Sequence, residues 1–146
     1  MVLIAIGWLA WRLIMSFADE VPPLNTNTTE QTPASSQNPV QTAQYKTYAP
    51  AELGNEYQRH IIFFHASWCP ECRAFEQALL SGTLPNDVQI LKADYDSETE
   101  LKQKYSVVIQ STFVEVNKQG ELIAKWVGYG RDKTFAAIER GLGESR

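Results

Sequence analysis

The chain has little cysteine: two residues, Cys69 and Cys72, among 146. Two cysteines are too few to staple a small fold that lacks its own core, and they are half the ligands of a closed zinc site. No second Cys-x-x-Cys pair or nearby histidine pair completes such a site, because His60 and His65 both lie upstream on an expected strand. The cysteines are therefore a structural disulfide, part of a metal site or a redox pair, and structural zinc is the least favoured.

Positive charge is also sparse. The 13 lysines and arginines are outnumbered by 17 acidic residues, and they are scattered rather than gathered in a stripe. This pattern lacks the electrostatic footprint of a nucleic-acid-binding protein, so no nucleic acid is expected as a partner. The hydrophobic content of 44% suits one domain with a real core, and it excludes a chain that is disordered throughout.

An apolar run of full membrane-spanning length is missing as well. The N-terminus, MVLIAIGWLAWRLIMSFADE, is apolar over residues 2–17 apart from Arg12, whereas a spanning helix wants about 20 residues. Arg12 lies toward the C-terminal half of the run, where its long side chain can reach the membrane surface. We predict that residues 1–18 are a membrane anchor or, less favoured, a signal segment cut after Ala18. In both cases the domain lies outside the cytoplasm, in the cell envelope or on the periplasmic side, and cleavage would give a secreted form.

Residues 19–44 are dominated by Pro, Thr, Asn, Gln and Ser. Such a segment buries too little apolar area to offset the entropy of ordering it. We therefore predict a flexible linker here, followed by a folded domain at residues 45–146.

From Tyr45 onward, strand and helix patterns alternate. Expected strands lie at 45–48, 60–65, 88–94, 112–116 and 121–127, and expected helices at 50–57, 69–80, 97–105 and 132–142. Ser97 and Glu100 match a capping box for the third helix, and Gly120 supplies the turn between the last two strands. The order predicts an α/β fold with a central mixed sheet, parallel in part with an antiparallel hairpin, flanked by helices. The expected core residues include Phe63, Phe64, Phe75, Val107, Phe113, Val114 and Val116.

The two cysteines fall at the junction of an expected strand and helix, in the stretch FFHASWCPECR. Cys69 lies at the start of the helix, where backbone N–H groups and the helix dipole favour negative charge, so its thiolate is stabilised. Cys72 lies one turn further along, on the same side and close enough to close a disulfide. We expect Cys69, with an exposed sulfur, to attack a substrate disulfide and Cys72 to resolve the mixed disulfide.

Over about residues 45–142 the chain resembles the thioredoxin family. The family's Trp-Cys-x-x-Cys motif stands here as WCPEC at residues 68–72, and Lys92 and Asp96 in KADYD fall at family-like positions. The chain is most similar to the membrane-tethered, extracytoplasmic branch, whose members exchange disulfides with exported proteins. The resemblance implies a thioredoxin-like fold and a redox-active disulfide between Cys69 and Cys72, with no bound cofactor.

Two positions depart from the family pattern. The family carries a buried aspartate six residues before its first cysteine, which assists deprotonation of the second. Phe63 stands there, so Lys92 is kept without this aspartate as its partner. The family also carries a cis-proline facing the dithiol, and alignment on TFVEV puts Ser111 at that place. A cis bond before serine costs about 2.5–4 kcal/mol. The serine is therefore expected to alter substrate docking and to open space beside the sulfurs.

Further residues are expected to contact substrate or to tune the site. Trp68 shields the dithiol, and Pro70 starts the helix, where its missing N–H does no harm. His65 lies beneath the dithiol as a hydrogen-bond donor and proton shuttle, or as a structural histidine. By the resemblance, the loop that faces the cysteines consists of Gln110, Ser111 and Thr112.

The charge of Glu71 sets the expected direction of electron flow. A carboxylate in the same turn disfavours the Cys69 thiolate, and Arg73 is expected to point down the helix and away. A less acidic attacking thiol makes a weaker oxidant. The leading hypothesis is therefore a monomeric, membrane-tethered protein-disulfide reductase that acts on exported proteins and takes electrons from a membrane partner.

Two alternatives stay open. Cys69 and Cys72, together with His65, can hold a soft metal or share an iron–sulfur cluster between two chains, as a thioredoxin-like metal-binding module. The domain can also be a redox-inactive interaction module. The leading hypothesis itself includes no metal.

Overall fold

The computed structural model describes residues 43–146. The expected anchor at 1–18 and most of the expected linker at 19–44 lie outside the described residues. Within 43–146, no helix has both the length and the apolar character that crossing a membrane requires. Gln44, the last residue of the expected linker, is buried, and its side-chain amide donates hydrogen bonds to the carbonyl oxygens of Pro85 and Val88.

A five-stranded sheet in the order β1-β3-β2-β4-β5 forms the centre of the domain. Pairing of β1 with β3 and of β3 with β2 is parallel, whereas β4 and β5 are antiparallel to their neighbours, which confirms the predicted mixed sheet. Gly120 makes the β4–β5 turn with a left-handed φ of 72°. The strands are β1 (Tyr45–Thr47), β2 (Arg59–His65), β3 (Val88–Asp94), β4 (Thr112–Val116) and β5 (Leu122–Val127).

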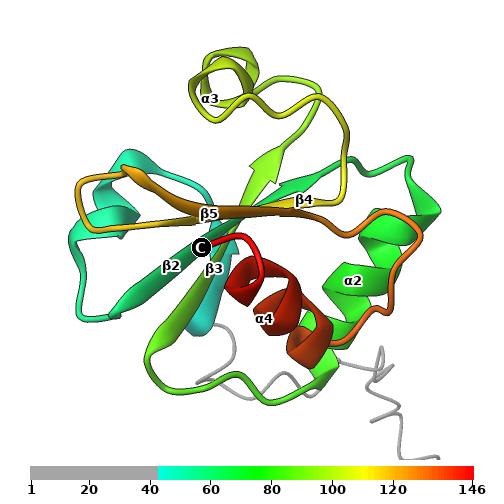
Figure 1. Ribbon diagram of the computed structural model, residues 1–146, viewed down its shortest axis with the longest axis horizontal. Coiled ribbons are helices and arrows are strands. Elements are labelled where there is room, and N and C mark those ends of the chain that lie inside the picture. The colour runs from blue at the N-terminus through cyan, green and yellow to red at the C-terminus, as the bar shows by residue number, and fades with distance from the viewer. Residues whose placement is uncertain (1–42) are drawn as a thin grey trace, which may run out of the picture. The chain divides into compact units, whose positions relative to one another are not determined.

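Helices α2 (Pro70–Ser81) and α4 (Phe135–Gly143) cover one face of the sheet, and α3 (Thr99–Lys104) covers the other (Figure 1). A short 3₁₀ helix, Pro50–Gly54, stands in place of the longer helix predicted at 50–57. The capping box predicted for α3 is wrong, because the N–H and hydroxyl of Ser97 both donate to the carboxylate of Asp94, and the N-cap is Glu98.

Alternate side chains of β2 point to opposite faces of the sheet and enter two hydrophobic layers. Phe63 lies in the layer beneath α2 and α4, where its ring stacks on Phe113 with 4.4 Å between centroids. Phe64 lies in the layer beneath α3. The predicted core residues are all buried, and burial of one such side chain stabilises the fold by about 1.5–3 kcal/mol. The two layers therefore fix β2, and with it the start of α2.

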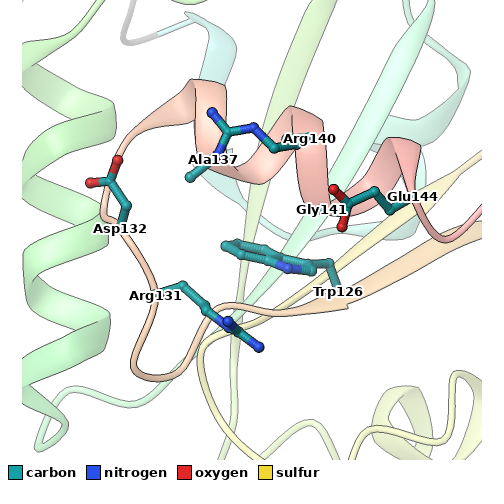
Figure 2. Close-up of a pocket in the computed structure, with 7 residues that line it drawn as sticks. All are labelled: Trp126, Arg131, Asp132, Ala137, Arg140, Gly141 and Glu144. Atoms are coloured by element: carbon teal, nitrogen blue, oxygen red, sulfur yellow. The ribbon is translucent and has the colours of Figure 1, made fainter.

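Helix α4 packs closely on β5 at Gly141. A Cβ at this position would lie 2.2 Å from Nε1 of Trp126, so the indole occupies the space that any side chain would need. A hollow next to this contact is lined by residues of β5, α4 and the loop between them (Figure 2). None of the predicted site residues lines it.

Candidate active site

The dithiol lies where β2 gives way to α2. β2 ends at His65, and residues 66–68 lead to Cys69, the N-cap of α2, whose backbone is extended (φ −85°, ψ 118°). The guanidinium of Arg73 donates to the carbonyl oxygen of Ser67 at 2.8 Å, so the prediction that Arg73 points away from the site is wrong. Side chains on a helix lean toward its N-terminus, and this lean brings Arg73 back to the turn before Cys69.

The two thiols are both free and both buried, with Cys69 2% and Cys72 0% exposed. The prediction of an exposed Cys69 sulfur is therefore wrong. Burial opposes ionisation of Cys69, but hydrogen bonds from the backbone and thiol of Cys72 and from the amide of Gln110 outweigh it, so its pKa lies below its usual value. Burial raises the pKa of Cys72. Cys69 is therefore the richer in thiolate at neutral pH.

The loop before β4 forms the other wall of the site. Nε2 of Gln110 lies 3.8 Å from Sγ of Cys69, and Oγ of Ser111 lies 3.0 Å from Sγ of Cys72, so the two residues face one sulfur each. Thr112 faces neither sulfur, because its hydroxyl donates to a carbonyl oxygen within the loop. Ser111 has a left-handed φ of 59°, and residues 43–146 contain no cis peptide bond, so the Gln110–Ser111 peptide is trans.

Trp68 and Pro70 lie on the solvent side of the motif. The indole of Trp68 is 57% exposed, and its Nε1 donates to the carboxylate of Asp96 at 2.8 Å. This hydrogen bond holds the ring beside the dithiol and gives Asp96 a role in positioning it. Pro70 is exposed in the first turn of α2.

Glu71 does not place an unpaired charge near the sulfurs. Its carboxylate accepts a hydrogen bond from the N–H of Gly130 at 2.9 Å and pairs with Lys133. The hydrogen bond from Lys133 holds the pKa of Glu71 below its usual range. The backbone of Glu71 contributes a hydrogen bond that lowers the pKa of Cys69. The predicted disfavouring of the thiolate by the carboxylate therefore stays a prediction, and its pairing with Lys133 opposes it.

A family model described as Thioredoxin matches residues 39–140, well over half of the chain. The chain belongs to the thioredoxin family. Thioredoxin H2 of Arabidopsis thaliana is 34% identical over 81 residues, which are 55% of this chain and 60% of that protein. Mitochondrial Thioredoxin-3 of Saccharomyces cerevisiae is 32% identical over 84 residues, 56% of this chain and 61% of that protein. The chain thus spans about three fifths of the length of these thioredoxins.

Solved thioredoxin structures share the fold. Thioredoxin NaTrxh from Nicotiana alata has a TM-score of 0.55 and 20% identity, over 70% of this chain and 93% of that chain. Trxlp from Edwardsiella tarda EIB202 has a TM-score of 0.53 and 20% identity, over 70% of this chain and 99% of that chain. These similarities confirm the predicted thioredoxin-like fold of the domain.

The thioredoxin domain gives Lys92 a carboxylate partner from an unexpected place. Nζ of Lys92 lies 2.7 Å from Oε1 of Glu76, so the lysine pairs with a carboxylate of α2 in place of the aspartate that Phe63 replaces. Nε2 of His65 lies 3.1 Å from Oε2 of the same carboxylate, and the hydroxyl of Tyr45 donates to Oε1. Burial opposes ionisation of Glu76, but Lys92 outweighs it and the pKa lies below its usual range. Burial lowers the pKa of His65, which is therefore largely neutral at pH 7.

Sequence reasoning missed Glu76, although its spacing from the thioredoxin motif was a signal for it. Glu76 follows Cys72 by four residues, and residues four apart lie on the same face of a helix. This face packs on the sheet, so a carboxylate here meets the side chains that rise from β2 and β3. His65 accordingly lies against Glu76, although its buried Nε2 makes no hydrogen bond within the described residues. Within the described part of the chain, no three His, Cys, Asp or Glu side chains are arranged to hold a metal ion.

Proposed function

We propose that this thioredoxin-family protein is a thiol–disulfide oxidoreductase in which Cys69 attacks and Cys72 resolves. The proposal rests on the difference in acidity between the two thiols, which lie in one turn at the start of α2. The pKa of Cys69 is lowered, whereas that of Cys72 is raised. The first sulfur supplies a thiolate, and the second stays a thiol until a mixed disulfide has formed.

The reaction is a two-electron exchange. The Cys69 thiolate attacks one sulfur of a substrate disulfide, and the other substrate sulfur leaves as a thiolate. Cys72 then attacks Cys69, the bond between Cys69 and the substrate breaks, and the second substrate sulfur leaves with the electron pair. The dithiol is oxidised to a disulfide, and the substrate disulfide is reduced to two thiols.

Protein disulfides are the proposed substrates. Large apolar side chains are exposed beside the dithiol: Trp68 at 57%, Val108 at 86% and Tyr129 at 51%. Trp68 precedes Cys69 directly, Val108 lies two residues before Gln110, and Tyr129 lies in the loop that bonds to Glu71 through its backbone. Exposed apolar side chains gathered in this way are typical of a surface that contacts another protein.

The proposed direction is reducing. Strong oxidants with a Cys-x-x-Cys pair stabilise their reduced form through a very acidic attacking thiol. Here the hydrogen bonds that lower the pKa of Cys69 come from neutral groups. The charge of Lys133 is paired with Glu71, and Arg73, at the turn before Cys69, donates to the carbonyl oxygen of Ser67 rather than to either sulfur. Such a site stabilises the thiolate modestly, so its disulfide is comparatively hard to reduce and its dithiol is a good donor.

Equilibration of the full chain with glutathione buffers tests this direction. We expect a reduction potential near about −270 mV, whereas a value near about −120 mV would refute the reductase assignment. Glu71→Gln/Lys133→Met is the matched variant, because it removes both charges of the ion pair and leaves neither of them unpaired. We expect this double substitution to leave the potential nearly unchanged. A large shift would mean that the ion pair acts on the dithiol.

We further propose that the domain works outside the cytoplasm on exported proteins, as a monomer held at the membrane through residues 2–17 and supplied with electrons by a membrane partner. The apolar run at 2–17 and the polar composition of 19–44 support this arrangement. A reporter that is active only in the cytoplasm, fused after Arg146, should be inactive. The same reporter on a chain without residues 1–18 should become active, and activity of both fusions would contradict the proposal.

A further inference from the structure

The hydroxyl of Ser111 is a buried polar group directed at a sulfur. Ser111 is 0% exposed, and its Oγ lies 3.0 Å from Sγ of Cys72. Its N–H donates to the carbonyl oxygen of Phe64 at 2.9 Å, and its own carbonyl oxygen accepts from the N–H of Gly128 at 2.8 Å. The backbone of Ser111 is therefore fixed from two sides, on β2 and on the loop after β5. This frame holds the hydroxyl against Cys72.

Cys72 needs help to ionise where it lies. It is 0% exposed, and its burial disfavours the thiolate that the resolving step requires. The place of the family's buried aspartate is taken by Phe63, and the carboxylate of Glu76 is already paired with Lys92. A backbone hydrogen bond from Ala66 favours the Cys72 thiolate, and Ser111 is the residue outside α2 and its N-cap whose side chain also bonds to this sulfur in the described part of the chain. The titratable groups on the elements packed here are Cys69 and Glu76 on α2, His65 on β2, Lys92 on β3 and Tyr45 on β1.

We propose that Ser111 is a catalytic residue whose hydroxyl donates a hydrogen bond to the Cys72 sulfur as this sulfur becomes the resolving thiolate. The assignment rests on the proposed function. A hydroxyl does not take up the Cys72 proton as a carboxylate would, so Ser111 stabilises the thiolate rather than acting as a base. Gln110 is then the hydrogen-bond partner of the attacking sulfur, Cys69, and Ser111 is the partner of the resolving sulfur, Cys72.

The step balances without a further reactant. Cys72 loses its proton to water, and its thiolate attacks Sγ of Cys69 in the mixed disulfide. The Cys69–Cys72 bond forms while the bond from Cys69 to the substrate breaks, and the electron pair of the broken bond leaves on the substrate sulfur. That sulfur gains a proton from water, which replaces the one released by Cys72.

Reaction of the reduced full chain with equimolar 5,5′-dithiobis(2-nitrobenzoate) separates the two steps. Attack by Cys69 releases one thionitrobenzoate, and attack by Cys72 on the resulting mixed disulfide releases the second. Hydrogen bonds to charged groups are strong enough that their loss slows a step roughly tenfold or more. We expect Ser111→Ala and Ser111→Gly to slow the second release by this factor and to shift the pH midpoint of that phase upward. The first release should be nearly unchanged.

The glycine variant separates chemistry from backbone strain. Glycine adopts the φ of 59° at this position more readily than serine, so Ser111→Gly keeps the fold while it removes the hydroxyl. Ser106 provides the matched control, because it also has a left-handed φ, of 50°, but is exposed and outside the site. Ser106→Ala and Ser106→Gly should leave both phases at the wild-type rate.

The outcomes distinguish this inference from the function on which it rests. A wild-type chain that never releases the second thionitrobenzoate would overturn the proposed function and the role of Ser111 with it. A normal second phase in Ser111→Gly, beside a normal wild-type chain, would overturn the role of Ser111 alone. Equal slowing of both phases would also overturn it, because a hydroxyl that acts on Cys72 affects only the second.

Discussion

Cys72→Ser should accumulate mixed disulfides with protein substrates, whereas Cys69→Ser should trap none. The thiolate of Cys69 forms the first bond to the substrate, and without the Cys72 sulfur that bond is not resolved. Cys72 alone is a poor nucleophile because burial raises its pKa. Tagged full-length chains, quenched in acid and separated on non-reducing gels, should show high-mass adducts for Cys72→Ser that disappear with dithiothreitol.

The variant that lacks both cysteines is the control for this trapping. Like Cys69→Ser, it should show no high-mass adducts on the gel, and it should not reduce a disulfide-bonded test protein such as insulin. Equal trapping by the two single variants would contradict the division of labour. Trapping by Cys69→Ser alone would reverse it.

Phe63→Asp should come close to unfolding the domain, although it restores the residue type that the family carries at this position. Phe63 is 0% exposed, stacks on Phe113 at 4.4 Å and meets the edge of Phe75 at 6.1 Å. Removing a buried phenylalanine costs about 3–5 kcal/mol, and an unpaired buried carboxylate adds to that loss. We expect a loss of roughly 4 kcal/mol or more in the free energy of unfolding, measured by urea denaturation, against a typical total of about 5–15 kcal/mol.

Phe63→Leu is the matched control, since it keeps an apolar side chain in the layer. It should lose roughly 1–1.5 kcal/mol. A Phe63→Asp chain as stable as the Phe63→Leu chain would contradict the prediction. Such a result would mean that Lys92, the register partner of residue 63 on β3, can leave Glu76 and pair with the new carboxylate.

The strands were predictable because their signals are local. The bounds of β3 and β4 agree with those expected from the sequence pattern. The capping box at Ser97 failed because a competing acceptor, Asp94, lies three residues before it and takes both of its donors. Short-range competition of this kind is not visible in a capping motif read alone.

The site was predictable where a single stretch defines it, and not where distant elements meet. The cysteines follow from one motif, and the placement of Gln110 and Ser111 follows from alignment on the next strand. The pairs formed by Glu76 and Lys92 and by Glu71 and Lys133 depend on how α2 packs on the sheet and on the loop after β5. The sequence alone shows neither that Glu76 can replace the missing aspartate beside Lys92 nor that Lys133 pairs with the charge of Glu71.

The close contact at Gly128 limits how this protein can be re-engineered. A Cβ there would lie 2.8 Å from Cζ of Phe75 and 3.0 Å from the carbonyl oxygen of Ser111. Even alanine would therefore displace the buried ring of Phe75 or the loop that faces Cys72. Pro70, by contrast, is exposed and can be varied without moving a neighbour. A library aimed at new redox properties therefore has its freedom at the motif itself, whereas position 128 accepts only glycine, although it contributes no atom to the chemistry.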